Sequence, residues 1–484
     1  MAYLGLDIGT SAVKAVVLND DGILIADASA GLKTHQPKPG WSEQNPEDWL
    51  SAVKVCCGEL SEKLGETWRG MKAIGLSGQM HGAVLLDKSR CPIRPAILWN
   101  DSRSVEQSDM INEATTDIET KAGIFAMPGF TAPKVLWCAQ HEPDTHSQIA
   151  HILLPKDYIR LALTGELATD MADAAGTLWL DQKNRIWDDE LCQASRTDMN
   201  WLPRLVEGSE VSGLLGSDIA DELGLPAGIP VAGGGGDAAA GALGIGAINK
   251  GDAFISLGTS GQLFVSDDIY RPAPETVVHC YAHCVPDRWF QMACMLNGAS
   301  PMSWFAEFTG KPITHLLADA EAAARSPLFL PYLTGERTPH NDANIRGTFY
   351  GLHPDTTPGE AMRAVVEAIA YSFADCYDCL QQAGTTLTSV AAIGGGTRSD
   401  YVLQTLADVL ELPIQRYRGS ETGPALGAAR LAMVASGNHQ LSEIAIKPEQ
   451  DQIFEPRSQK NSYHAENLTC WRTLYQVLKP FAAT

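Results

Sequence analysis

One pattern of strand, Gly-Thr-Ser turn and strand occurs twice in this chain, and the second copy follows the first by about 250 residues. The first copy covers residues 3–18, with Gly9, Thr10 and Ser11 in its turn, and the second covers residues 253–265. Each copy is predicted to fold as a β-hairpin, because a short turn separates two runs of strand-forming residues. The repetition indicates that the chain consists of two related halves.

The rest of the chain alternates strand-like and helix-like runs, which is typical of an α/β protein. With 484 residues, of which 45% are hydrophobic and 19% charged, the chain exceeds the size of one hydrophobic core. The stretch 232–241 is rich in Gly and Ala and is predicted to be the junction of two domains, opening into a helix at 242–248. We therefore expect one domain at residues 1–245 and another at 246–484.

Further helices are expected where apolar residues recur at helical spacing. They cover residues 46–64, 152–163, 362–373, 401–410 and 468–478. The polar segment 457–467, just ahead of the last of them, is predicted to be irregular.

Charge and composition exclude several classes of partner. A formal net charge of -22 makes nucleic acid and membrane surfaces unfavourable partners. The sequence has no apolar run of the roughly 18 residues that a membrane-spanning helix needs, and its start lacks the basic residues of a signal peptide. We therefore expect a cytoplasmic protein.

The cysteines point to a reducing compartment rather than to a disulfide framework. Eleven cysteines stand singly or within apolar runs, which is typical of reduced thiols in the cytoplasm. Two clusters, at 279–284 and 376–379, could hold a metal, but neither has a second ligand pair at zinc-finger spacing. Both clusters are predicted to be structural.

The two Gly-Thr turns are the first candidates for chemistry. A turn of this composition can direct several backbone N–H groups and a hydroxyl at one point, as a nucleotide phosphate requires. The candidate nucleotide-binding residues are Gly9, Thr10 and Ser11 in the first turn and Gly258 and Thr259 in the second. Asp7, just ahead of the first turn, is positioned to hold a magnesium ion. For either turn alone a plain hairpin is the alternative, and their repetition favours the phosphate interpretation.

Two further Gly-rich segments complete the candidate site. Gly394, Gly395 and Gly396 lie between a predicted strand and a predicted helix, where a flat backbone can admit an adenosine. This segment matches neither the P-loop nor the dinucleotide fingerprint. Asp237 follows four glycines, which clear space for a ligand in front of its carboxylate and favour a general base. The alternative is that Asp237 only caps the helix that follows.

Taken together, these motifs resemble the FGGY family of carbohydrate kinases, and the resemblance runs from Asp7 to about Ala432. The resemblance implies an α/β, two-domain actin- and hexokinase-like (ribonuclease H-like) ATPase fold with a deep interdomain cleft. It also implies ATP and Mg²⁺ as cofactors, catalytic roles for Asp237 and Asp7, and metal binding by the same two carboxylates. The segment 419–429 is similar to a late family signature beside the nucleotide.

Within this family, residues 76–82 and 99–103 resemble segments of the branch that phosphorylates D-xylulose. Residues 127–134, 154–158, 173–177 and 335–340 are similar to further segments of the same branch. The resemblance implies D-xylulose as the small-molecule partner and assigns the sugar to Gln79, Met80, His81, Trp99, Asp101 and Asp237. For His81, the alternative is a core histidine whose hydrogen bonds are satisfied within the protein.

Two other functions remain open at this point. A gluconokinase or another ketose kinase would have the same fold and differ in its sugar. A non-catalytic, actin-like ATP-binding protein would need the two turns and the Gly-rich adenosine segment, but not Asp237 as a base. A homodimer is a further expectation.

Overall fold

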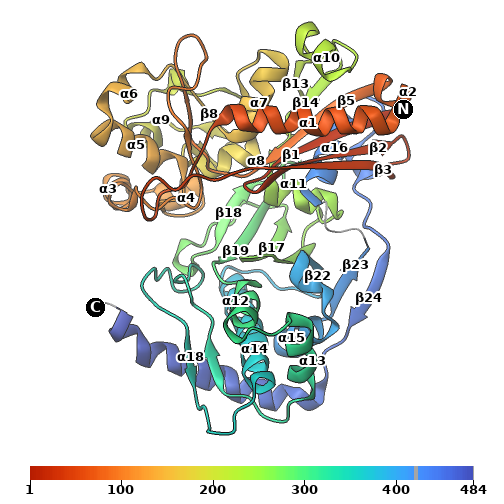
Figure 1. Ribbon diagram of the computed structural model, residues 1–484. Helices are drawn as coiled ribbons and strands as arrows, with labels where there is room; N and C mark the ends of the chain where they lie inside the picture. Colours follow the sequence, from red (N-terminus) through yellow and green to blue (C-terminus); the bar gives the residue numbers. More distant parts are fainter. Residues whose placement is uncertain (419–422, 483–484) are drawn as a thin grey trace.

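The computed structural model describes residues 1–418 and 423–482, and it consists of two halves, each built on a mixed seven-stranded sheet (Figure 1). The strands of the first sheet lie in the order β13 (Val211–Leu214), β14 (Pro230–Ala232), β5 (Met71–Gly78), β1 (Ala2–Ile8), β2 (Ala12–Asn19) and β3 (Leu24–Gly31), and β15 (Gly235–Gly236) also pairs with β5. The strands of the second sheet lie in the order β18 (His279–Ala282), β19 (Trp289–Met295), β17 (Gly261–Asp267), β16 (Ala253–Leu257), β22 (Val390–Ile393), β23 (Ile414–Tyr417) and β24 (Gln450–Phe454).

Both predicted hairpins are present, and each occupies the same place in its sheet. β1 pairs antiparallel with β2 and parallel with β5, and β16 likewise pairs antiparallel with β17 and parallel with β22. All seven residues of β1 are buried, as expected for a central strand covered on both faces. The turns of both hairpins therefore open at the carboxyl end of a central strand, where α/β sheets bind their ligands.

Helices cover both faces of the first sheet. α1 (Pro46–Leu64) packs on one face, against Leu4, Leu6 and Ile8, and α16 (Gly423–Ala435) packs on the other face, against Tyr3. α16 approaches the central strands so closely that a Cβ on Gly5 would lie 2.1 Å from the carbonyl oxygen of Ala425. Only glycine fits there, so a helix from late in the chain is fixed on the sheet of the first half.

The second sheet has its own helical layer. Buried residues of α14 (Pro358–Gln382) and α15 (Asp400–Leu410) form one hydrophobic cluster with Ile255 and Leu263 of the second sheet. The remaining helices discussed below are α7 (Pro155–Thr164), α8 (Met171–Ala174), α11 (Asp237–Gly244), α12 (Ser300–Thr309) and α18 (Asn461–Ala482). None of the helices in residues 1–418 and 423–482 is long and apolar enough to cross a membrane.

The helix predicted at 46–64 is confirmed by α1, and those at 362–373, 401–410 and 468–478 lie within α14, α15 and α18. Three other expectations were wrong. Residues 152 and 153 belong to β8 (His151–Leu153), and α7 starts only at Pro155, which is suited to a first helical turn. The helix expected at 242–248 begins at Asp237 and ends at Gly244, because Gly246 turns the chain with a φ of 70°. The segment expected to be irregular is helical from Asn461, where the buried His464 anchors α18.

Candidate active site

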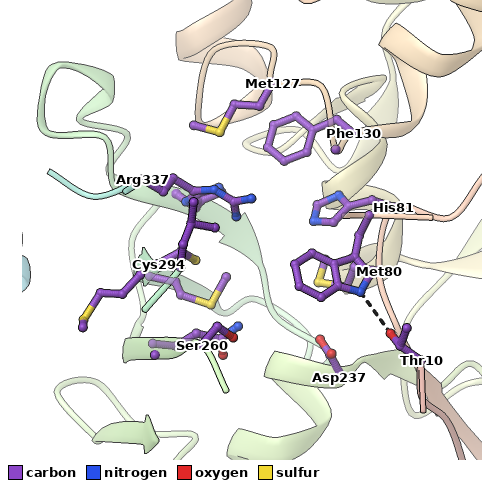
Figure 2. A pocket seen from close by; sticks show the side chains of 17 residues that line it. Thr10, Met80, His81, Met127, Phe130, Asp237, Ser260, Cys294 and Arg337 are labelled. Carbon is purple, nitrogen blue, oxygen red and sulfur yellow. Dashed lines mark hydrogen bonds between the residues drawn. The ribbon is translucent and has the colours of Figure 1, made fainter. Parts of the chain in front are cut away.

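A cavity of about 170 Å³ lies between the two halves, with side chains from both in its wall (Figure 2). From the first half it is lined by Thr10, Met80, His81, Trp99, Met127, Gly129, Phe130 and Asp237. From the second half it is lined by Ser260, Gly261, Gln262, His279, Met292, Cys294, Met295, Leu296 and Arg337. A ligand in this cavity therefore contacts both halves, and their relative position decides the geometry of the site.

The sheet register brings the two candidate carboxylates together. Asp7 on β1 lies opposite Ser77 on β5, and Gly235 on β15 pairs with the other side of Ser77. Asp237 follows two residues later as the first residue of α11, where its Oδ1 accepts a 2.8 Å hydrogen bond from the N–H of Ala238. The N-cap residue is Gly236, so Asp237 does not occupy the N-cap position that the sequence left open.

Burial brings the pKa values of both acids closer to neutral pH. Burial raises the pKa of Asp7 to about 7, and the charge of Asp237 adds to this rise. Burial also raises the pKa of Asp237 to about 6, although the Ala238 N–H partly offsets it. Oδ1 of Asp7 is buried without a hydrogen-bond partner. Two such carboxylates can bind a cation, or one of them can accept a proton during the reaction.

We expect the rate of the reaction to rise with pH on the acid side of the pH profile, because the reaction needs an ionised base. Only the ionised form of Asp237 can accept a proton, so its activity is lost below its pKa and present above it. The expected result is that kcat/KM for the sugar increases between pH 5 and 7, with a midpoint at or below the pKa of about 6. A pH series at saturating ATP measures this, and a rate that stays flat down to pH 5 would contradict it.

The first Gly-Thr turn is held by a chain of side-chain hydrogen bonds. Trp99 Nε1 donates to Thr10 Oγ1 over 3.0 Å, and Thr10 Oγ1 donates to Gln79 Oε1 over 3.0 Å. Gln79 in turn donates to Gln44 Oε1, and Gln44 donates to the carbonyl of Thr10 over 2.7 Å. Thr10 and Trp99 line the cavity, whereas Gln79 lies behind Thr10 and is not part of the cavity wall. The same turn contains Gly9, whose N–H donates to the carbonyl of Ala12.

The first turn also places Ser11 at the surface, where its side chain is exposed. The second turn is fixed by the start of α12: the N–H groups of Gly298 and Ala299 donate to the carbonyls of Thr259 and Gly258 over 3.0 and 2.7 Å. Its neighbour Ser260 reaches the cavity wall. The structure thus brings the two turns and Asp237 to one cavity.

The predicted adenosine segment lies directly against the second turn. Gly394 has a φ of 96°, and a Cβ there would lie 2.8 Å from the carbonyl oxygen of Leu257. A Cβ on Gly396 would lie 2.6 Å from the Leu257 side chain, whereas one on Gly395 would meet open space. The two glycines are therefore needed for close packing between β16 and the segment after β22. Of the similar late segment 419–429, residues 419–422 lie outside the described residues.

His81 presents an acceptor nitrogen to the cavity. Its Nδ1 is 2.6 Å from the carbonyl oxygen of Gly176, which can only accept, so Nδ1 carries the proton and Nε2 is left as an acceptor. Burial lowers the pKa of His81, which keeps the ring neutral. The ring stacks on Phe130 with centroids 4.7 Å apart (Figure 2). Both His81 and the preceding Met80 line the cavity, so the core-histidine alternative does not describe the loop.

The backbone at His81 is held in the left-handed region, with a φ of 68°. Its carbonyl accepts hydrogen bonds from Thr131 Oγ1 at 3.1 Å and Lys134 Nζ at 2.9 Å. Both donors lie in residues 127–134, a segment that resembles the same branch of the family as the sugar loop at residues 76–82. Such a conformation persists where the surroundings fix it, which is common at ligand sites.

Asp101, like Gln79, is a predicted sugar contact that does not line the cavity. The carboxylate of Asp101 accepts hydrogen bonds from the backbone N–H groups of Ser42 and Arg103 and from the Arg103 guanidinium. Its side chain is fully buried, and Asp101 is not among the residues of the cavity wall. The acid is occupied by Arg103, so its role in this structure is to hold the loop.

Several cavity residues were not assigned from the sequence. Arg337 lies in the segment 335–340, which was recognised as similar to the sugar-kinase branch without a role for the guanidinium (Figure 2). His279 belongs to a cluster that was interpreted as structural, yet it lines the cavity, and burial lowers its pKa to about 3. Phe130 lies in the segment 127–134, but its stacking on His81 leaves no pattern in the sequence.

A cavity between two related halves, with a Gly-Thr turn from each half and a buried acid between them, fits a two-domain phosphotransferase. Comparison with known proteins agrees with this class. Residues 2–244 match the N-terminal domain and residues 253–436 the C-terminal domain of the FGGY family of carbohydrate kinases. The chain belongs to this family.

Individual relatives cover the chain almost completely. It is 43% identical to the xylulose kinase of Escherichia coli K12 over 99% of this chain and 100% of that protein. A solved structure titled as a "xyloylose kinase" from Brucella ovis is 41% identical, has a TM-score of 0.96 and covers 99% of this chain and 100% of its own. Gluconate kinase from Lactobacillus acidophilus is 27% identical, with a TM-score of 0.92, and covers 100% of this chain and 98% of its own.

Proposed function

We propose that the protein transfers the γ-phosphoryl group of ATP to D-xylulose and forms D-xylulose 5-phosphate. The observation that carries this proposal is the cavity in which Asp237 and both phosphate turns meet a sugar-sized space lined by Met80 and His81. The full-length similarity to xylulose kinases supports the choice of sugar. The reduced state of the cysteines in residues 1–418 and 423–482 is consistent with a cytoplasmic enzyme. The expected homodimer stays a prediction.

In this proposal Asp237 acts as the general base. Its carboxylate accepts the proton of the terminal sugar hydroxyl as that oxygen attacks the γ-phosphorus. The new O–P bond forms while the bond between the γ-phosphorus and the bridging oxygen breaks, and ADP leaves with that electron pair. The N-terminus of α11 behind Asp237 favours the negative charge that develops at this point. The backbone N–H groups of the two turns orient the phosphates, so most of the catalysis is positioning.

The acids fit a divalent cation. Asp7 Oδ1 is buried without a hydrogen-bond partner and faces the charge of Asp237, and hard oxygen ligands of this kind suit Mg²⁺. Asp7 and Asp237 would hold the ion, which supplies charge neutralisation for the phosphates when it is bound. Its charge would also lower the pKa values of both acids and leave Asp237 ready to accept a proton.

Asp7→Asn is expected to raise the Mg²⁺ concentration that gives half-maximal rate by about tenfold or more, because one charged ligand is lost. The KM for the sugar is expected to change little. Mg²⁺ titrations of the initial rate, with sugar saturating, measure this for both forms. An unchanged Mg²⁺ requirement, together with a collapse of sugar affinity, would contradict the role given to Asp7.

The sugar end of the cavity is built from His81 Nε2 as an acceptor, with Phe130 and Trp99 as apolar surfaces. A polyol chain can place its hydroxyls against the imidazole and its carbons against the rings. The Arg337 guanidinium closes the cavity from the second half and can donate to the sugar oxygens. Both halves therefore contribute to sugar recognition in this proposal.

His81→Ala is expected to raise the KM for D-xylulose by about tenfold and to leave the KM for ATP nearly unchanged, because a buried partner of a sugar hydroxyl is lost. His315→Ala, at an exposed position of the second half, serves as the matched control and is expected to change neither constant. If His81→Ala weakened the affinity for ATP and not that for the sugar, the loop would contact the nucleotide rather than the sugar.

A second candidate acceptor is an aldonate such as D-gluconate. Arg337 lines the cavity, and its guanidinium can pair with the carboxylate of an acid. The gluconate kinase of Lactobacillus acidophilus has a similar fold at 27% identity. Arg337→Gln separates the two candidates, because it would abolish use of an acid far more than use of a neutral ketose.

The direct test of the proposed activity is product formation. Purified protein, ATP, Mg²⁺ and D-xylulose are expected to give ADP and a new phosphomonoester signal by ³¹P NMR, with neither in the absence of the sugar. D-gluconate, glycerol, L-ribulose and L-fuculose tested in the same way define the alternatives. ATP binding without turnover of any of these sugars would favour the non-catalytic ATP-binding protein instead.

A further inference from the structure

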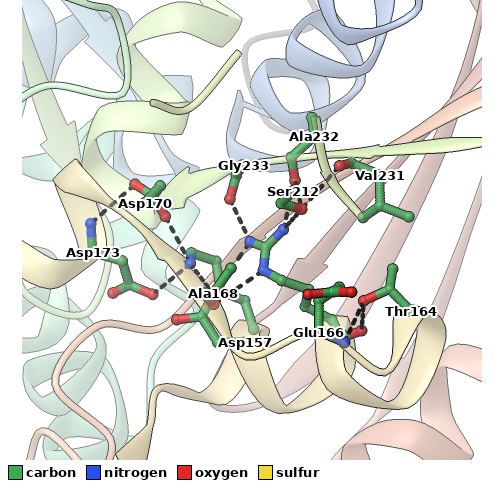
Figure 3. A network of polar contacts seen from close by, with 12 residues as sticks. Asp157, Thr164, Glu166, Ala168, Asp170, Asp173, Ser212, Val231, Ala232 and Gly233 are labelled. Carbon is green, nitrogen blue, oxygen red and sulfur yellow. Dashed lines mark hydrogen bonds and ion pairs between the residues drawn. The ribbon is translucent and has the colours of Figure 1, made fainter. Parts of the chain in front are cut away.

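A fully buried group of charges lies behind the active site. It consists of Lys156, Asp157, Arg160, Asp170 and Asp173, here called the Lys156 cluster, and every side chain in it has 0% exposure. Figure 3 shows its three carboxylates, those of Asp157, Asp170 and Asp173. Lys156 Nζ lies 2.5, 2.7 and 3.3 Å from carboxylate oxygens of Asp157, Asp170 and Asp173. None of these side chains lines the cavity, and the reaction described above uses none of them.

Folding alone does not explain this cluster. Removing five charged groups from water is costly, and apolar side chains of similar volume often stabilise a core equally well or better. Burial raises the pKa of Asp173 well above its ordinary value, so this acid keeps its proton and is neutral. The two positive charges of Lys156 and Arg160 are therefore balanced by the two carboxylates of Asp157 and Asp170. A balanced cluster of this kind is rigid and directional, because each partner must keep its geometry.

One side of the cluster leads to the sugar loop. Asp170 pairs with Lys156 through Oδ2, while its Oδ1 accepts the N–H groups of Ala172 and Asp173 at 2.9 and 3.1 Å and caps α8. α8 runs directly into the turn Ala175–Thr177, whose Gly176 carbonyl binds His81 Nδ1. A Cβ on Gly176 would lie 2.6 Å from Nδ1 of His81, so this turn and the ring are in direct contact.

The other side of the cluster leads to Asp237. The Arg160 guanidinium pairs with Asp157 at 3.2 Å and donates to the carbonyl of Ala232 at 2.7 Å and to the carbonyl of Gly233 (Figure 3). These two carbonyls belong to the Gly-rich segment that ends at Asp237. Glycines offer no side chain by which this segment could be anchored, so the guanidinium fixes it through its backbone.

We propose that the Lys156 cluster is a positioning device that holds the sugar loop and the Gly-rich segment of Asp237 in fixed relation to each other. Asp170 acts through α8 and Gly176 on His81, and Arg160 acts through Ala232 and Gly233 on Asp237. Lys156 joins the two sides. The inference rests on the proposed function, because it assigns the sugar to His81 and the proton transfer to Asp237.

Two conservative variants separate the two sides. Asp170→Asn removes the ion pair with Lys156 but keeps an oxygen that can cap α8. Arg160→Lys keeps the buried charge but replaces the planar fork by a single ammonium, which cannot reach the same set of carbonyls. The controls are Asp408→Asn, whose carboxylate is equally buried and pairs with Arg457, and Arg94→Lys, whose guanidinium pairs with Glu43 and Glu142.

The expected results differ in kind for the two variants. Asp170→Asn is expected to raise the KM for D-xylulose, and the Kd measured by calorimetry without ATP, by roughly tenfold, with kcat changed less than threefold. Arg160→Lys is expected to lower kcat by roughly tenfold to a hundredfold and to shift the midpoint of the acid limb, with the sugar Kd nearly unchanged. The two controls are expected to alter neither kinetic constant.

The outcomes distinguish this inference from the proposed function. Wild-type protein that does not phosphorylate D-xylulose would refute the function. If the wild type is active, two results would refute the positioning role. In the first, folded Asp170→Asn and Arg160→Lys variants match the wild type. In the second, both variants lose kcat and sugar affinity in equal measure. Urea unfolding of each variant, followed by tryptophan fluorescence, shows whether it is folded under the assay conditions.

Discussion

Asp237→Asn is expected to reduce kcat by at least about 10²-fold, and up to about 10⁴-fold, while leaving ATP and sugar binding largely intact. The physical reason is that a positioned base contributes this much to a proton transfer, and an amide cannot accept the proton. The fold is expected to survive, because the Asn oxygen can accept the Ala238 N–H as the carboxylate does. Steady-state rates and calorimetric binding of both substrates measure the two effects.

The control for this variant is Asp188→Asn. Asp188 also stands at the start of a short helix, where it accepts the N–H of Leu191 at 2.9 Å, but it is remote from the cavity wall. Its replacement is expected to leave kcat unchanged. Near-normal turnover by a folded Asp237→Asn variant would mean that Asp237 is not the general base and only forms the start of α11.

Lys156→Met is expected to destabilise the first half by about 3–5 kcal/mol, because it leaves the carboxylate of Asp170 buried without its cation and leaves Asp157 with Arg160 alone. Met is unbranched and only one atom shorter than Lys, so the loss reflects charge more than packing. The shift of the urea midpoint, followed by tryptophan fluorescence at neutral pH, measures the effect.

Lys121→Met is the matched comparison, since Lys121 also pairs with two carboxylates, Asp188 at 3.0 Å and Glu190 at 2.6 Å. Its side chain is 25% exposed, and partly exposed pairs contribute only about 0–1 kcal/mol. Similar, small shifts for both variants would mean that the buried carboxylates take up protons and that the cluster is not held by its lysine.

Much of the fold was predictable because it depends on local patterns. The two hairpins could be recognised from runs of strand-forming residues around a Gly-Thr turn, and α1 from its apolar spacing. The boundaries that were wrong depend on single residues whose effect is local but ambiguous. Pro155 begins a helix where apolar spacing alone extended it backward into β8, and Gly246 ends one.

The candidate site was predictable where one residue carries the chemistry. Asp237 was identified by the four glycines before it, and His81 by the loop that resembles the sugar-kinase branch. The resemblance also assigned Asp101 to the sugar, whereas in the structure its carboxylate pairs with Arg103 and does not line the cavity. A similar motif does not reveal which acid is already paired.

The parts that could not be predicted connect residues far apart in the chain. His81 is held by Gly176, and Arg160 holds the carbonyls of Ala232 and Gly233. Arg337 reaches the same cavity from the second half. Such contacts follow from the packing of the sheets, and a single sequence has no local pattern that encodes them.

The most direct test of the central claim compares acceptors by their specificity constants. D-xylulose is expected to exceed glycerol in kcat/KM by about tenfold or more, because a three-carbon polyol leaves buried polar groups of the sugar site unpaired. D-gluconate, measured beside them, reports on the charge of Arg337. The account predicts the highest value for D-xylulose, and a higher value for glycerol or D-gluconate would contradict the assignment of this cavity to a neutral five-carbon ketose.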